Sequence, residues 1–164
     1  GVTFDLVSEA FVGNEKVWID TSTYLRRQAV AKTEGAAGEK PAKAEKMTRS
    51  MPAASSIWVV PSDIGRRYGA VSGDRNPIHL YAATAKLLGF PQAIAHGMWS
   101  KAACLAALDG RLPNAYRVDV QFKLPVLLPA KVAFSSEATA NGYNFSVNDA
   151  RKGKPHLAGT VTAL

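Results

Sequence analysis

The chain has 164 residues, of which 47% are apolar and 20% charged, and its formal net charge is +7. This composition is typical of a globular protein with one domain and attached segments. Its apolar runs are far shorter than the roughly 20 residues of a membrane-spanning helix, it does not open on a signal-peptide pattern, and its only cysteine, Cys104, excludes an intrachain disulfide. We therefore expect a cytoplasmic protein without a membrane partner.

The first segment predicts a β-hairpin. Residues 2–10 (VTFDLVSEA) and 16–24 (KVWIDTSTY) are rich in β-branched and aromatic residues, and a Val-Gly-Asn turn separates them. Residues 8–20 also share a weak strand–turn–strand pattern with residues 136–149. The hairpin at 1–30 is therefore a candidate remnant of an earlier copy of the fold that follows it.

Residues 31–54 predict a flexible linker. The segment is rich in alanine, glycine and proline, has no aromatic residue, and carries five basic residues against three glutamates. Much of the positive charge therefore belongs to a solvated linker. We expect no nucleic-acid partner, because the sequence holds no motif of a nucleic-acid-binding fold. The folded domain is then expected over residues 55–164.

The domain opens with short elements. Residues 56–61 (SIWVVP) predict a strand that ends at a proline. One or two turns of helix follow over 62–71, with Ser62 as the expected N-cap. Residues 80–90 predict a second helix, which a glycine and a proline end.

A third helix is predicted over residues 97–110, and it is apolar almost all round, which is typical of a fully buried helix. Extended runs follow at 116–126, 130–139 and 143–152, and a fourth ends the chain. We expect them to form consecutive antiparallel strands. The predicted fold class is α+β, with an antiparallel sheet wrapped around one long helix.

The stretch SGDRNPIH at 72–79 is the main candidate for chemistry. Its glycine permits unusual backbone geometry and its proline favours an extended residue before it, so the loop is stiff. A stiff loop can hold Asp74 and His79 in a fixed relation, and such a pair can flank one water molecule and move its protons. Asn76 can donate to the aspartate or position the water. The alternative is an Asp-capped turn in which His79 caps a helix.

A second stretch, AHGMWS at 95–100, opens the long helix. The first N–H groups of a helix have no intrahelical acceptor and attract negative charge. Gly97 allows a ligand to approach this backbone closely, which is the equipment of an oxyanion site. The alternative is a plain helix start, with His96 as a partly buried polar residue.

Residues 68–85 (YGAVSGDRNPIHLYAATA) resemble the hydratase-2 signature of the MaoC-like dehydratases, also called (R)-specific enoyl-CoA hydratases. The signature is an aromatic residue, Ser-Gly-Asp-x-Asn-Pro-aliphatic-His, and a small residue about six positions later. The AHGM at 95–98 resembles the second motif of the family, and the layout is consistent over 55–164. The signature residues are Tyr68, Ser72, Gly73, Asp74, Asn76, Pro77, Ile78, His79 and Ala85.

The resemblance implies a hot-dog fold, in which the sheet wraps the helix at 97–109. It also implies a lyase of fatty acid metabolism that adds water to trans-2-enoyl thioesters of coenzyme A or acyl carrier protein. The product is the (R)-3-hydroxyacyl thioester, and the reaction is reversible. No metal or redox cofactor is needed. The helix and the strand at 116–126 should line the acyl tunnel.

The resemblance implies a role for each residue of the two motifs. Asp74 is the base towards water, and His79 helps to bind the water and delivers a proton to C2. Negative charge on the thioester oxygen is met by the N–H of Gly97. The supporting and substrate-binding residues are Asn76, Ser72, His96 and Met98.

Some family members contain two hot-dog halves in one chain, and the amino-terminal half lacks the catalytic motif. Residues 1–30 fit the last strands of such a half, and 31–54 the linker. The partner is then either that half or, in a homodimer, a second copy. Two other functions stay open: a thioesterase on the same fold, and a non-catalytic acyl-binding or assembly module.

Overall fold

The structure is a computed structural model that describes residues 2–26 and 54–164. The chain divides into two compact units, Gly1–Met47 and Thr48–Leu164. The predicted linker at 31–54 lies, except for Ala54, outside the described residues. Within the described parts, no helix combines the length and the hydrophobicity that crossing a membrane requires.

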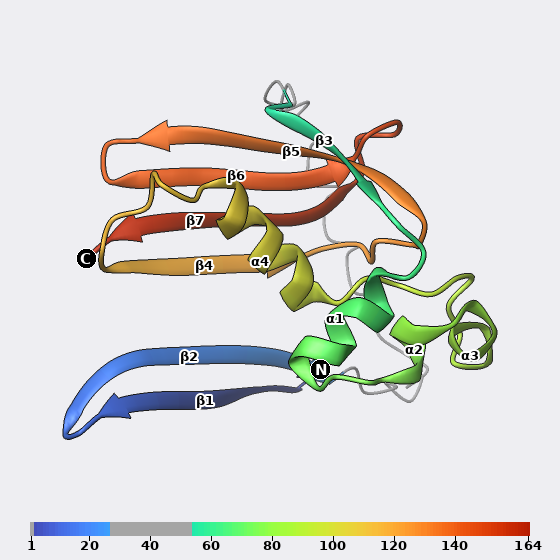
Figure 1. Ribbon diagram of the computed structural model, residues 1–164, viewed down its shortest axis with the longest axis horizontal. Helices are drawn as coiled ribbons and strands as arrows, with labels where there is room; N and C mark the ends of the chain where they lie inside the picture. Colours follow the sequence, from blue (N-terminus) through green and yellow to red (C-terminus); the bar gives the residue numbers. More distant parts are fainter. Residues whose placement is uncertain (1, 27–53) are drawn as a thin grey trace, which may run out of the picture. The chain divides into compact units, whose positions relative to one another are not determined.

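The predicted hairpin forms in the first unit. Strand β1 (Val2–Val12) pairs antiparallel with β2 (Glu15–Arg26), and Gly13 takes a positive φ of 60° in the turn between them (Figure 1). Large apolar side chains on both strands are more than half exposed, among them Phe11 at 54% and Trp18 at 53%. A two-stranded hairpin is marginally stable by itself, so we expect another part of a protein to pack against this apolar surface.

The second unit contains a five-stranded antiparallel sheet in the order β3-β5-β6-β7-β4 (Figure 1). Its strands are β3 (Ser56–Val60), β4 (Tyr116–Phe122), β5 (Ala130–Thr139), β6 (Gly142–Asp149) and β7 (Pro155–Ala163). The strands β5, β6 and β7 are neighbours in sequence and in the sheet, as predicted.

The expectation that all four later strands pair consecutively is wrong for β4, which pairs with β7 at the edge of the sheet. The segment between β4 and β5 has other partners. Val126 accepts a hydrogen bond from the N–H of Ala95 at 2.9 Å, and the N–H of Leu128 donates to Ala93 at 2.8 Å. These bonds draw the connection away from a tight hairpin and tie it to the residues that precede the long helix.

Four helices accompany the sheet: α1 (Ile64–Ser72), α2 (Pro77–Leu80), α3 (Ala82–Leu87) and α4 (Gly97–Ala107). The first begins later than predicted. Its N-cap position is Asp63, not Ser62, because the N–H of Ile64 closes a turn onto the carbonyl of Pro61 at 3.3 Å.

The helix predicted over 80–90 is divided in two. Tyr81 is extended, with φ −142° and ψ 145°, and it separates α2 from α3. The first piece starts at Pro77, which suits the first position of a helix because its missing N–H would have no partner there. The loop between α1 and α2 therefore ends in a short helix of its own.

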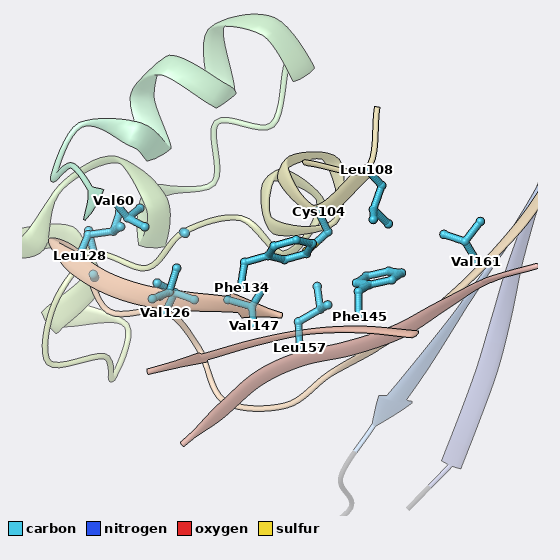
Figure 2. Packing of buried hydrophobic residues seen from close by; sticks show 14 residues of the cluster. Val60, Cys104, Leu108, Val126, Leu128, Phe134, Phe145, Val147, Leu157 and Val161 are labelled. Carbon is cyan, nitrogen blue, oxygen red and sulfur yellow. The ribbon is translucent and has the colours of Figure 1, made fainter. Parts of the chain in front are cut away.

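Helix α4 packs across the sheet with one face (Figure 2). Cys104 on this face and Leu108, directly after the helix, are fully buried and point towards Phe134 and Phe145 of the sheet. The expectation of a fully buried helix is wrong within this chain, since Met98 on another face is 47% exposed. One sheet covers only one side of a helix, so its remaining apolar surface stays open.

The adjacent residues Val60 and Val59 of β3 provide a test of this core, since they are 1% and 70% exposed. Val60→Ala should lower the free energy of unfolding by about 2–3 kcal/mol, because it removes two buried carbons and leaves a cavity. Val59→Ala should change it by no more than about 0.5 kcal/mol. Chemical denaturation of both variants measures the difference, and equal effects would contradict the assigned faces of β3.

Candidate active site

The loop between α1 and α2 holds Asp74 through short-range hydrogen bonds. Gly73 takes a left-handed φ of 78° after the last turn of α1. The hydroxyl of Ser72 donates to the Tyr68 carbonyl at 2.9 Å and accepts from the N–H of Asp74 at 3.2 Å. Oδ1 of Asp74 accepts from the N–H of Asn76 at 3.1 Å. This leaves Oδ2 of an exposed carboxylate available for chemistry.

The side chain of Asn76 has a local role. Its Oδ1 accepts from the N–H of Ile78 at 3.3 Å and so caps α2. Two roles were predicted for this residue, donation to the aspartate and positioning of the water. Its oxygen fixes the start of the helix that carries His79, which supports the site indirectly, and the two roles stay predictions.

His79 is buried, with 8% of its surface exposed. Its Nδ1 lies 2.8 Å from the carbonyl oxygen of Ile94. A carbonyl can only accept, so Nδ1 carries the hydrogen, and the neutral ring keeps its lone pair on Nε2. Any proton that His79 takes up or gives away therefore moves at Nε2.

His96 lies against both motif residues. Its Nε2 donates to the main-chain carbonyl of Asp74 at 3.0 Å and lies 3.7 Å from Oδ2 of that residue. Its ring stacks on His79 with centroids 3.7 Å apart, and Tyr68 packs at 5.0 Å. The sequence predicted His96 as a substrate contact, whereas its observed contacts show that it also holds the backbone of Asp74.

The environment of His96 favours its neutral form. Burial lowers its pKa below the ordinary value of 6.5, and electrostatic repulsion between the two imidazole rings of His79 and His96 lowers it further. The hydrogen bond to the Asp74 carbonyl and the Asp74 carboxylate act in the opposite direction without overcoming burial. Nδ1 is buried and without a hydrogen-bond partner among the described residues, so a proton added there would have no acceptor.

This pKa shift predicts a pH dependence of stability. Below pH 6.5 His96 takes up a proton in the unfolded chain but stays neutral in the folded chain. The free energy of unfolding should therefore fall as the pH falls towards the pKa of His96 in the folded protein. One proton contributes a slope of at most about 1.4 kcal/mol per pH unit. His96→Gln should flatten this slope, and the control His156→Gln should not. Denaturation between pH 5 and 7 measures it, and an unchanged slope in His96→Gln would contradict a neutral His96.

Asp74, His79 and His96 are also the group best suited to a metal ion in the described parts of the chain, since their ligand atoms lie within 4.8 Å of one another. However, Nε2 of His96, which faces the carboxylate, already donates its hydrogen to a carbonyl. It has no lone pair for a metal in this arrangement. The donor set therefore fits proton transfer better than metal coordination.

The N-terminus of α4 adjoins this group, because His96 is its N-cap residue and Gly97 its first residue. The bare face of Gly97 is occupied by the ring of Phe122, since a Cβ there would lie 3.0 Å from Cε1 of that ring. Phe122 is 51% exposed, so its ring has room to move. Met98 beside Gly97 is half exposed as well.

Several groups at the site were not predicted individually. The carbonyl of Ile94 fixes the His79 tautomer, and the Phe122 ring covers Gly97. Both come from outside the two motifs, and nothing in their local sequence marks them. Phe122 does lie in the strand that was expected to line the acyl tunnel.

Comparison with known proteins identifies the family. The pattern of the MaoC like domain family matches residues 32–159, so the chain belongs to this family. It is 40% identical over its whole length to 3-hydroxyacyl-thioester dehydratase X of Mycobacterium tuberculosis. The chain spans 57% of that relative's length.

Solved structures agree with this assignment. HtdX of Mycobacterium tuberculosis matches with a TM-score of 0.80 and 36% identity over 100% of this chain and 60% of its own. The R-hydratase PhaJ1 of Pseudomonas aeruginosa matches with a TM-score of 0.53 and 31% identity over 66% of this chain and 77% of its own. The second unit therefore has the hot-dog fold of the α+β class, as the sequence predicted.

Proposed function

We propose that the protein catalyses the reversible hydration of trans-2-enoyl thioesters of coenzyme A or acyl carrier protein to (R)-3-hydroxyacyl thioesters. One observation carries the proposal: the Asp74 carboxylate, the buried ring of His79 and the N-terminus of α4 meet at one place. Membership of the MaoC-like family and the names of its relatives support the same reaction class.

The proposed proton path follows from the hydrogen bonds. Water lies between Oδ2 of Asp74 and Nε2 of His79, and Asp74 takes one of its protons. The water oxygen bonds to C3, and the electron pair of the double bond moves to the thioester oxygen as an enolate. Asp74 passes the proton from water to the free Nε2 of His79, and His79 then delivers it to C2, so both residues return to their starting forms. The Nδ1–H stays with Ile94 throughout.

The enolate oxygen needs a donor, and we assign it the N–H of Gly97, which has no acceptor within α4. Ser72 and Asn76 support the loop. His96 holds the Asp74 backbone, and we assign it a contact with the substrate as well. Met98 is placed to contact the acyl chain. Hydration involves no net oxidation or reduction, so the path needs no redox cofactor. Residues of the chain supply each proton donor and acceptor around the water, so we propose no metal.

The proposed partner is a second hot-dog unit, either an amino-terminal half of the same protein or a second copy. The apolar hairpin at β1 and β2 and the open side of α4 are surfaces that such a unit would cover. The greater length of the dehydratase relative supports the double hot-dog alternative.

A two-channel assay distinguishes this function from its alternatives. A hydratase removes the absorbance of the conjugated enoyl thioester without releasing a free thiol. A thioesterase releases the thiol. A non-catalytic acyl-binding module does neither, but a saturated acyl thioester still raises its melting temperature.

Substitution of the proton-transfer pair should abolish most of the activity. Asp74→Asn keeps the shape of the side chain and removes the base, so hydration should slow by about 10²–10⁴-fold, and His79→Ala should have a similar effect. The double variant should lose much less than the product of the two, because both residues act on one water. An Asp74→Asn variant that keeps more than about a tenth of the rate would refute the assignment.

Gly97→Val tests the oxyanion site. The added side chain must displace the Phe122 ring, which is half exposed, so we expect a folded protein in which the thioester carbonyl is kept from the N-terminus of α4. Loss of such a donor slows turnover by roughly 10²–10³-fold. The control Ala83→Val places the same side chain at an exposed position of α3, outside α4. Melting temperature and hydration rate are measured, and a full rate in folded Gly97→Val would place the carbonyl elsewhere.

A further inference from the structure

Helix α1 carries two glycines one turn apart, Gly65 and Gly69, and both are buried. Neither has the positive φ that requires glycine. In the interior of a helix alanine is the better residue, because glycine loses more backbone freedom on folding. The reason for this glycine pair must therefore be the space around it.

The space beside each glycine is filled by the backbone of a motif residue. A Cβ on Gly65 would lie 1.9 Å from the carbonyl oxygen of His79, and a Cβ on Gly69 would lie 2.8 Å from the carbonyl oxygen of Asp74. Real Cβ atoms do not approach other atoms so closely. The two residues that we assign to proton transfer thus rest with their main chain directly on α1.

We propose that Gly65 and Gly69 are positioning residues, which set the depth at which Asp74 and His79 lie and hence the spacing of their side chains. The catalytic roles of Asp74 and His79 rest on the proposed function. The contact of their backbone with the two glycines does not depend on it. The glycine pair acts through the backbone and touches no reacting atom.

The contacts on the other side of the loop explain why its depth matters. The carbonyl of Asp74 that faces Gly69 is the one that accepts from Nε2 of His96 at 3.0 Å. Residue 94 binds the loop twice, because its carbonyl holds Nδ1 of His79 and its N–H donates to Ile78 at 3.1 Å. The loop is therefore fixed between α1 and the 94–96 segment, and a methyl group on α1 would push Asp74 and His79 against Ile94 and His96.

Gly65→Ala and Gly69→Ala in the full chain test the proposal. A displacement of about 1 Å can cost as much as 10²-fold in rate, so we expect kcat to fall about 10-fold in Gly69→Ala and further in Gly65→Ala, where the overlap is larger. KM should change less than about 3-fold, because the substrate still binds when only the proton path is misplaced. Gly69→Ala carries the test if Gly65→Ala does not fold.

Nuclear magnetic resonance of the histidine ring nitrogens gives a readout that needs no turnover. In the wild-type protein His96 should show the Nε2–H form and His79 the Nδ1–H form, and Gly69→Ala should shift the Nε2–H resonance of His96. If the wild-type protein does not hydrate enoyl thioesters, the proposed function fails, yet this shift still decides whether the glycine pair positions the loop.

Gly89→Ala is the control. It strains a position with φ of +89° that has nothing within 4 Å, so it should lower the melting temperature and leave kcat and the ring spectrum unchanged. The proposal would be overturned if Gly65→Ala and Gly69→Ala both kept the wild-type kcat and the wild-type ring spectrum. This holds for either change in melting temperature, including the rise that alanine produces in an unhindered helix.

Discussion

The site depends on one main-chain carbonyl, that of Asp74. It accepts the Nε2–H of His96 on one side and lies against the bare backbone of Gly69 on the other. A carboxylate in a glycine-containing surface loop would otherwise be free to move with the loop. Because its backbone is held at two points, Oδ2 can stay close to the stacked rings of His79 and His96 while the side chain itself remains open to solvent.

The same constraint assigns protons to the two histidines. Each ring gives one hydrogen to a carbonyl, His79 through Nδ1 and His96 through Nε2. The stacked rings are buried, and two positive charges at 3.7 Å would repel each other strongly. Burial lowers the pKa of His96 and so favours its neutral form. In the proposed mechanism the transferred proton therefore passes through His79 alone. The proposed division of labour is therefore electrostatic in origin: one histidine orients, and the other exchanges a proton.

The fold places the N-terminus of α4 beside the motif loop and leaves apolar surface uncovered elsewhere. The sheet covers one side of α4, and the N-terminus of this helix emerges beside the motif loop, where unpaired N–H groups can meet a developing negative charge. The opposite side of α4 and the hairpin of β1 and β2 keep exposed apolar side chains. Exposed apolar surface of this kind marks an interaction site, which agrees with the proposed pairing of hot-dog units.

The sequence by itself determined the hairpin, the strands, the long helix and the motif loop, because these follow from local patterns of apolar residues, glycine and proline. It also marked Asp74 and His79 through a dense motif. It did not determine that β4 pairs with β7, that one face of α4 stays open, or that His96 binds the Asp74 backbone. Only the tertiary structure decided these, because each depends on groups far apart in the chain. The partner of a backbone carbonyl, or the space beside a glycine, cannot be read from the type of residue at that position.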